Sequence, residues 1–407
     1  MTGERTSQEP TLSVEVARSL DTVALEEWAS LTVGKSIYAS WAWYRSLERD
    51  ERFSPRYLLV RDPQGRLLGA MPIYHTSGGG NPFYNPATAF EEFFARSTVE
   101  SWVPGLSLGS RAAYMTQLLV TETSDRRRIV EFLLNSAFGP RADASASDVV
   151  ATWMFYVPEP DATLVASLMP SDALVLYGGA DQTLHVEWSS FDAYLGALSG
   201  RRRSSVRKEL AAFGRSGGSV VRASLGPDTV PRIAPLFAET QTKYGRPTES
   251  ARAESFLLQQ AEYLAGFSRV FLCERNGQVV GFALFYEYES VLHARLVGFD
   301  YSALGSYEYF ATLFYEPIRY AIENGLQRIH FGFESYDGKL GRGASPSPLW
   351  CFVRHRDVDL SVMGESARAW NVRKMTDFVE RYRSFLREGV RYEPSPAPGT
   401  VVGVSAR

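Results

Sequence analysis

The 407-residue chain has very little cysteine and no long apolar segment. Its two cysteines, Cys273 and Cys351, are too few for a disulfide scaffold and lack the spacing of metal ligands, so we expect both to be buried apolar side chains. The first residues contain no apolar signal core, and the longest apolar runs are strand-sized, far below the roughly 20 residues of a membrane helix. We therefore expect a cytoplasmic protein with no membrane span and no metal.

The chain also lacks a strong charge of either sign. With 43 Lys and Arg against 46 Asp and Glu, its formal net charge is −3, so any binding of nucleic acid or membrane must be local. The sequence contains no G-x-S-x-G elbow, no H-x-x-x-D acyltransferase motif and no G-x-x-x-x-G-K-[ST] phosphate loop. These absences argue against hydrolase and P-loop chemistry. The length favours two hydrophobic cores.

Two distant segments of the chain resemble each other. Residues 53–75 and 267–288 each contain two β-rich runs joined by a turn, with a glycine in the second run at Gly69 or Gly281. Such a pattern predicts a β-hairpin. Two hairpins alike in these details indicate one fold unit used twice, although unrelated hairpins could share the pattern.

The residues after each hairpin predict a strand, a helix and a second strand. In the second half we expect strands at 291–299 and 327–333 around a helix at 307–324, kinked at Pro317 and ended by Gly325. In the first half the same order is weaker, with a strand at 112–121, a helix at 125–138, a turn at 141–147 and a strand at 149–157. Each set is a right-handed crossover between parallel strands, which predicts an α/β fold with a mixed sheet.

A basic segment opens a predicted amphipathic helix after Ser199. Val206, Leu210 and Phe213 recur at helical spacing, and arginines fill the first turn. Cations at a helix start oppose the helix dipole, so their presence there indicates a site for phosphate or carboxylate. A solvated basic face is the alternative. The candidate anion ligands are Arg202, Arg203 and Arg207.

Side chains with catalytic potential follow the predicted strand 327–333. Glu334 would lie at the carboxyl end of a parallel strand, where open α/β sheets place their chemistry. Formation of an amide from an ester or thioester needs a base near the amine and cations for phosphates. A surface loop with routine ion pairs is the alternative. We expect Glu334 to be the base, with Asp337 as runner-up and Tyr336 as a third catalytic residue. We expect Lys339 and Arg342 to be phosphate ligands.

Candidates for binding the acceptor lie elsewhere. Tyr84 and Asn85 belong to the loop after the first hairpin, which follows the glycine triplet 78–80 and could reach a cleft between the two halves. His293 and Arg295 share one face of a predicted strand. We expect these four side chains to contact the acceptor.

The two most distinctive segments resemble those of the FemAB-like, peptidoglycan-biosynthesis-like proteins. YLGALSGRRRSSVRKEL is similar to their LSxxxRRxIRRE stretch, and YEPIRYAIENGLQRIHFGFESYDGKLGRG to their A-I-E-x-G-L-x-R-(x)-G…H-K-x-x-R-G block. Looser matches at SIYASWAWYRSLE, GAMPIYH and NPFYNPATAFEEFF extend the resemblance over most of residues 35–355.

The resemblance implies two tandem GNAT-like domains with a cleft between them. We expect a first domain at 1–180, a second at 181–392 carrying the basic helix and active site, and a flexible tail at 393–407. Better-known relatives transfer an amino acid from aminoacyl-tRNA to an amine, and others use acyl-CoA. Lys339 and Arg342 match the K-x-x-R-G block, but Asp337-Gly338 replace its Glu-His pair, so no histidine there can serve as acid or base.

The chain departs from ordinary acetyltransferases at the turn that holds the pyrophosphate of CoA. Backbone N–H groups of a Q/R-x-x-G-x-G/A turn bind that group, but Gly298 and Gly305 are too far apart to form one. The sequence therefore favours an aminoacyl-tRNA donor. The resemblance implies a cell-wall precursor or a small-molecule amine as acceptor, with no other cofactor. An acyl-CoA-dependent transferase and a non-catalytic ligand-binding module are the alternatives.

Overall fold

The structure, a computed structural model, describes residues 11–50, 54–78, 81–95, 97, 99–123, 125–138 and 148–386. The predicted turn at 141–147, the tail at 393–407 and two glycines of the triplet lie outside these ranges. No helix in the described ranges is both long and apolar enough to cross a membrane. Cys273 and Cys351 are free and buried, as expected.

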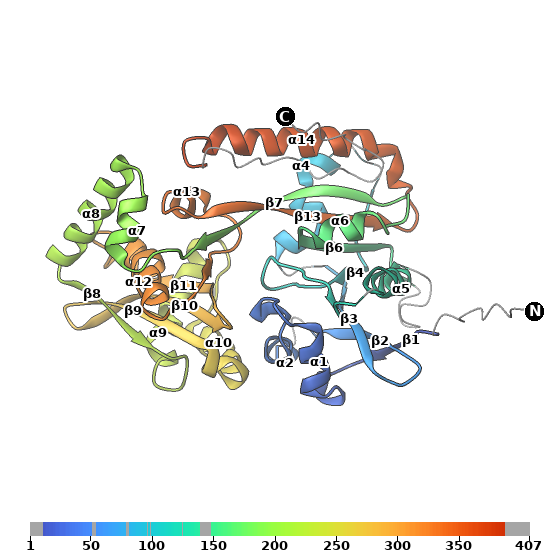
Figure 1. Ribbon diagram of the computed structural model, residues 1–407, viewed down its shortest axis with the longest axis horizontal. Helices are drawn as coiled ribbons and strands as arrows, with labels where there is room; N and C mark the ends of the chain where they lie inside the picture. Colours follow the sequence, from blue (N-terminus) through green and yellow to red (C-terminus); the bar gives the residue numbers. More distant parts are fainter. Residues whose placement is uncertain are drawn as a thin grey trace, which may run out of the picture.

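One mixed sheet runs through both halves of the described chain (Figure 1). In sheet order its strands are β1 (Ser13–Ala17), β2 (Arg56–Arg61), β3 (Leu67–Thr76), β4 (Gly105–Leu108), β6 (Ala151–Pro158), β13 (Ser345–His355), β7 (Leu174–His185), β12 (Arg328–His330), β11 (Val291–Phe299), β10 (Gln278–Tyr288), β9 (Ser268–Arg275) and β8 (Gly218–Ala223). The short strand β5 (Leu119–Val120) pairs with β3 beside this path.

Helices cover the sheet and join its strands. The α-helices are α1 (Leu25–Leu31), α2 (Trp41–Glu48), α3 (Pro86–Ala89), α4 (Glu91–Phe94), α5 (Arg126–Phe138), α6 (Asp161–Ala166), α7 (Phe191–Ala197), α8 (Gly200–Arg215), α9 (Val230–Lys243), α10 (Ser250–Leu264), α11 (Glu308–Phe310), α12 (Glu316–Glu323), α13 (Tyr336–Leu340) and α14 (Gly364–Tyr382). The 3-10 helices are η1 (Leu20–Thr22), η2 (Ile37–Ala39), η3 (Pro82–Tyr84), η4 (Ala265–Phe267) and η6 (Leu360–Met363). The π-helix is η5 (Ala311–Tyr315).

The predicted duplication is present in the sheet. In the first unit the hairpin β2–β3 pairs with β4, and β6 returns parallel to β4 after α5. In the second unit β9–β10 pairs with β11, and β12 returns parallel to β11 after α12. The repeated glycines have one physical reason, because a Cβ on Gly69 would lie 2.7 Å from Ile129 and one on Gly281 would lie 2.3 Å from Phe299. Each strand is tightly packed there, so only glycine fits.

The prediction of a strand at 112–121 is wrong. The parallel partner of β6 is β4, and only the last part of the predicted stretch forms a strand, as β5. Gly109, with a φ of 79°, ends the extended chain after β4. Ser110 N–H then donates to Thr116 Oγ1 at 3.0 Å, and Thr116 N–H donates to the Tyr156 carbonyl at 2.9 Å. These bonds hold residues 109–118 as a loop, although the β-rich composition of this stretch predicted a strand.

The two units exchange strands. β13 comes from the second half of the chain but lies between β6 and β7, and the end of β7 pairs with β12. In Figure 1, β7 and β13 accordingly run from one lobe to the other beneath α14. The predicted boundary at residue 180 therefore falls inside β7.

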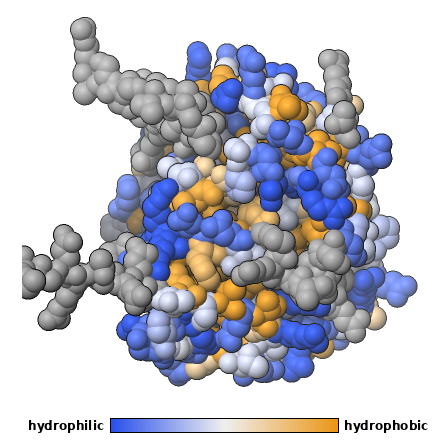
Figure 2. All heavy atoms as spheres, turned by 90° about the vertical axis from the view of Figure 1, so that its right-hand side faces the viewer, coloured by the Kyte–Doolittle hydropathy of each residue, from blue (hydrophilic) through white to orange (hydrophobic). Residues whose placement is uncertain are grey.

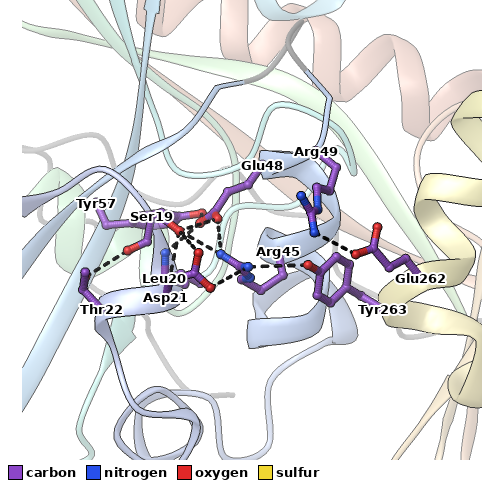
Figure 3. A network of polar contacts seen from close by, with 10 residues as sticks. All are labelled: Ser19, Leu20, Asp21, Thr22, Arg45, Glu48, Arg49, Tyr57, Glu262 and Tyr263. Carbon is purple, nitrogen blue, oxygen red and sulfur yellow. Dashed lines mark hydrogen bonds and ion pairs between the residues drawn. The ribbon is translucent and has the colours of Figure 1, made fainter.

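The units also share a hydrophobic core and a polar network. Trp43 and Tyr57 of the first unit belong to the same buried cluster as Leu257 and Leu284 of the second. Beside this core, Figure 3 shows α2 facing α10 through charged side chains. Its contacts are Arg45 to Asp21 and Glu48 at 2.6 Å each, Arg45 to Tyr263 at 3.4 Å, and Arg49 to Glu262 at 2.9 Å.

The outer face of the first unit presents a mixed surface. Figure 2 shows this face with hydrophobic residues gathered toward its middle and hydrophilic ones around them. The candidate catalytic side chains lie instead where the two units meet.

Candidate active site

The backbone is distorted just beyond β12. Glu334 and Ser335 are consecutive non-glycine residues with φ angles of 58° and 52°. The left-handed conformation costs an L-residue roughly 1–2 kcal/mol, and such distortions gather at functional sites, where the surroundings hold them. The kink leads into α13 and leaves the Glu334 side chain exposed.

Lys339 holds this kink from inside the protein. Its Nζ donates to the carbonyls of Gly332 and Phe333 at 2.9 and 2.8 Å, and the residue is 5% exposed. Both carbonyls directly precede Glu334. The structure thus makes Lys339 a positioning residue instead of the predicted phosphate ligand, because its donors point at backbone oxygens.

Raising the pH from about 8 to 9.5 should increase the stability of the protein, because it relieves the cost of a charged Lys339 in the interior. Burial lowers the pKa of Lys339 from 10.5 to about 8, whereas the unfolded chain titrates near 10.4. Between these values the unfolded state binds more protons, so the free energy of unfolding rises with pH, by roughly 2 kcal/mol at pH 9.5. Urea titrations of the wild type and Lys339→Met measure this rise, which should be missing in the variant. A difference between the two proteins that does not change with pH would contradict the assignment.

Glu334 has the surroundings of a base. Burial of part of the side chain raises the pKa of Glu334 above its usual range, and the nearby cations Lys339 and Arg246 oppose this shift. Arg246 is exposed in the turn between α9 and α10, next to Gly245 with its φ of 73°. No sequence pattern marks Arg246, and its approach to Glu334 follows only from the fold.

The first unit adds an aromatic wall beside Glu334. Tyr114 lies within electrostatic range of Glu334, and its ring stacks on Phe333 with centroids 5.3 Å apart. Phe83 packs edge-on against both rings, at 5.9 and 6.4 Å, and Asn81 Nδ2 donates to the Tyr114 hydroxyl at 2.9 Å. A carboxylate next to aromatic faces favours an ammonium group. The sequence had not singled out Tyr114.

Tyr84 and Asn85 support this wall from within the first unit. Tyr84 is 2% exposed, and its hydroxyl accepts a hydrogen bond from Tyr114 N–H at 2.6 Å. Asn85 Oδ1 accepts from Ala87 N–H at 2.9 Å and caps α3. The prediction that Tyr84 contacts the acceptor is wrong, because the side chain is buried and its hydroxyl already has a partner. Direct contact by Asn85 stays a prediction.

A buried polar cluster lies where β7, β11 and β12 meet. His330 Nε2 lies 2.8 Å from Asp181 Oδ1, and the ring of its parallel partner His293 is 5.3 Å away between centroids. Tyr38 of the first unit packs edge-on against both histidines. Burial holds the pKa of His293 well below 6.5, and the residue is 4% exposed. His293 is therefore a neutral interior residue, not the acceptor contact that we predicted.

Arg295 joins the two units beside this cluster. Its Nη1 donates to the carbonyl of Ala112 at 2.9 Å, and its guanidinium lies 4.9 Å from the centroid of the Trp43 ring. Arg295 also lowers the pKa of Tyr114, which burial raises. It thus fixes the loop that carries the aromatic wall, and contact with the acceptor stays a prediction.

Tyr336 and Asp337 differ in their exposure. The Tyr336 hydroxyl accepts from Ala180 N–H at 3.2 Å, and its ring packs against Phe378 and Tyr382 of α14 at 5.0 and 5.5 Å. Tyr336 therefore anchors α13 to β7 and α14. Asp337 is exposed on the same helix, so it is available to a substrate.

The basic helix α8 has an inner and an outer side. On the inner side Arg202 donates to the Ser384 carbonyl at 2.6 Å and lies over Phe385. On the outer side Arg203, Arg207, Lys208 and Arg215 line one shallow groove. Arg203 donates to a backbone carbonyl, and within the described chain no acidic side chain pairs with these four cations. The outer side is therefore free to meet an anion.

Arg342 is bound inside the second unit. Its Nη2 lies 2.7 Å from Glu209 of α8 and 2.9 Å from the Tyr315 hydroxyl, and its guanidinium lies 3.8 Å from the Phe310 ring centroid. The residue is 8% exposed. This ion pair ties α8 to the turn after α13 and replaces the phosphate contact that we predicted for Arg342.

A carboxylate of the protein occupies the start of the helix after β11. Gly305 and Ser306 donate their N–H groups to the two Glu308 oxygens at 3.0 and 2.8 Å. Glu308 is 2% exposed, and Arg275 lies 3.6 Å from it. Amides at a helix start are the groups that bind a phosphate. At this position two of them are already satisfied, in keeping with the missing glycine-rich turn.

A family model described as peptidoglycan biosynthesis/recognition matches residues 19–380. The chain belongs to the FemAB-like family. This membership indicates an acyltransferase. A comparison with curated proteins found no match. Within the described residues, no group of three His, Cys, Asp or Glu side chains could hold a metal ion.

Solved structures of the same fold support the tandem GNAT-like architecture. FemX superposes with a TM-score of 0.54 at 13% identity, covering 86% of this chain and 98% of its own. L-PGS from Bacillus licheniformis gives 0.51 at 11%, covering 88% and 99%. A conserved protein of unknown function from Bacteroides thetaiotaomicron gives 0.52 at 12%, covering 82% and 98%. At these identities the likeness shows the fold alone, and it confirms the predicted fold class.

Proposed function

We propose that this FemAB-like acyltransferase passes an aminoacyl group from aminoacyl-tRNA to an amine. The observation that carries the choice of donor is the occupation of the helix start by Glu308. A buried carboxylate at this position takes the amides that a CoA pyrophosphate would need. Acyl-CoA is therefore the less favoured donor.

The outer side of α8 offers an alternative place for phosphates. Arg203, Arg207, Lys208 and Arg215 form a local basic stripe on a chain of net charge −3. Cations spaced along a helix neutralise several phosphates of one RNA strand and release their counterions. This supports RNA as the carrier of the acyl group.

The aromatic wall and Glu334 suit the acceptor. An amine arrives protonated at neutral pH, and the carboxylate beside the Tyr114 and Phe333 rings attracts it. The ammonium first releases one proton to water, and Glu334 takes a second proton from the nitrogen as it attacks the ester carbonyl. The new C–N bond forms, the C–O bond to the tRNA ribose breaks, and the proton passes to the ribose oxygen.

We infer that the acceptor is an amine of a cell-wall precursor, with a small-molecule intermediate as the second choice. The description of the family as peptidoglycan biosynthesis/recognition supports the first. An aminoacyl-tRNA donor would place the reaction in the cytoplasm.

Donor consumption and RNA binding test this proposal together. With labelled aminoacyl-tRNA and acyl-CoA offered separately, we expect amine-dependent deacylation of the tRNA alone. The double variant Arg207→Ala/Lys208→Ala should weaken tRNA binding roughly tenfold and flatten its salt dependence by about 1.5 in slope, because two phosphate contacts are lost. The double variant Arg18→Ala/Arg66→Ala, which removes two cations from the first unit, should bind like the wild type.

Two results would contradict the proposal. Consumption of acyl-CoA but not aminoacyl-tRNA would make the chain an acyl-CoA-dependent transferase. If neither donor is consumed in the presence of amines, the result would favour a non-catalytic ligand-binding module.

A further inference from the structure

Two buried hydroxyl groups in the first unit have no partner in the described structure. The Tyr74 hydroxyl and Ser107 Oγ make no hydrogen bond, although the residues are 0% and 1% exposed. They lie directly opposite each other on β3 and β4, so their side chains share one face of the sheet. Buried hydroxyl groups nearly always have partners, so these two indicate an incomplete site.

Arg111 lies over the ring of Tyr74, and its guanidinium has no partner within the described chain. Its guanidinium is 5.8 Å from the centroid of the Tyr74 ring, and burial lowers the pKa of Arg111. No carboxylate or carbonyl within the described chain binds it. Arg45 and Arg295, two other arginines where the units meet, bind a carboxylate and a carbonyl respectively. A half-buried, unpaired guanidinium is therefore an exception that needs an explanation.

The loop that carries Arg111 is held firmly. Arg295 of the second unit binds the carbonyl of Ala112, and Tyr114 N–H donates to the Tyr84 hydroxyl. The side chain of Thr116 accepts from Ser110 N–H at 3.0 Å. With its neighbours fixed on both sides, Arg111 is positioned before any ligand arrives, which lowers the entropic cost of binding.

We propose that Arg111, together with the Tyr74 and Ser107 hydroxyls, binds an oxyanion of the acceptor, a carboxylate or a phosphate. A guanidinium and two hydroxyl donors match such a group, whereas a cation would be repelled. Tyr114 follows Arg111 by three residues, so their Cα atoms are at most about 11 Å apart. One loop thus carries both the anion-binding arginine and part of the aromatic wall, so a single acceptor can contact both. The assignment to the acceptor rests on the proposed function, but the binding of the anion does not.

Anion-dependent thermal unfolding and calorimetric titration test the site. Sodium phosphate and sodium acetate are compared with sodium chloride at constant ionic strength. At least one of the two oxyanions should raise the Tm saturably, and the responding salt shows whether the site prefers phosphate or carboxylate. Arg111→Gln should bind that anion at least tenfold more weakly. Tyr74→Phe should bind it several-fold more weakly while keeping or raising the Tm without anion, because it removes an unpartnered hydroxyl. Arg18→Ala, an exposed arginine of the same unit, should respond like the wild type.

Several outcomes would overturn the site. These are no response of the wild type to phosphate or acetate, or an undiminished response of Arg111→Gln. If Arg111→Gln does not fold, an undiminished response of Tyr74→Phe has the same force. Anion binding without transferase activity would keep the site and overturn the proposed function, whereas activity without anion binding would overturn the site alone.

Discussion

Glu334→Gln is expected to lower kcat/KM for amine acylation at pH 7 by roughly 100-fold or more, because a glutamine cannot take the proton from the amine. Glutamine keeps the size of the side chain, and the Lys339 contacts that hold the kink involve the preceding carbonyls, so the Tm should change little. The pH profile supplies a second readout. Since burial raises the pKa of Glu334, the wild-type rate should fall on the acid side at a pH above the usual carboxyl range, and this limb should be missing in the variant.

Single-turnover transfer from aminoacyl-tRNA, followed from pH 5 to 8, measures both effects. Asp337→Asn is the competing variant, because Asp337 is the other exposed carboxylate near the kink. Glu26→Gln, on the exposed face of α1, is the control and should leave the rate unchanged. If Asp337→Asn abolishes transfer while Glu334→Gln does not, Asp337 is the base.

The repeated unit could be predicted from the sequence because its signals are local. Turn residues between β-rich runs mark each hairpin, and Gly69 and Gly281 stand where packing leaves no room for a Cβ. The prediction of a strand at 112–121 was wrong for the opposite reason. Its β-rich residues form a loop held by Thr116 and by Arg295 of the other unit, and neither contact is visible in local composition.

The site was only partly predictable. The predicted order of strand, helix and strand placed Glu334 beyond the carboxyl end of a parallel strand, and the structure has it four residues after the end of β12. Tyr114 and Arg246 could not be found, because they approach Glu334 only after the two units and the α9–α10 turn have packed together.

The charged residues after Glu334 show a different limit. The sequence locates Lys339 and Arg342 near the site but does not tell which way they point. In the structure both are buried and bind protein groups. Glu308 was missed for a related reason, since nothing in the sequence reveals that a carboxylate folds back onto the helix start.

Arg342→Met is expected to lower the free energy of unfolding by about 3–5 kcal/mol, the range for breaking a buried ion pair from one side. The Arg342 and Glu209 side chains are 9% and 15% exposed, so removal of the guanidinium leaves a nearly buried carboxylate with only the Tyr315 hydroxyl. Methionine keeps an unbranched apolar stem but loses the stacking of the guanidinium on Phe310. Urea unfolding measures the loss.

A double-mutant cycle with Glu209→Gln separates the pair from the packing. The double variant should be less destabilised than the sum of the two single variants, because the second change removes the charge that the first leaves unpaired. Arg222→Met is the matched control, since its pair with Glu323 is exposed by 43% and 55% and should be worth less than about 1 kcal/mol. A loss of unfolding free energy as small as that of the control would mean that Arg342 does not form a stable ion pair with Glu209. Arg342 would then be free to bind a phosphate of the donor, as its place in the sequence first indicated.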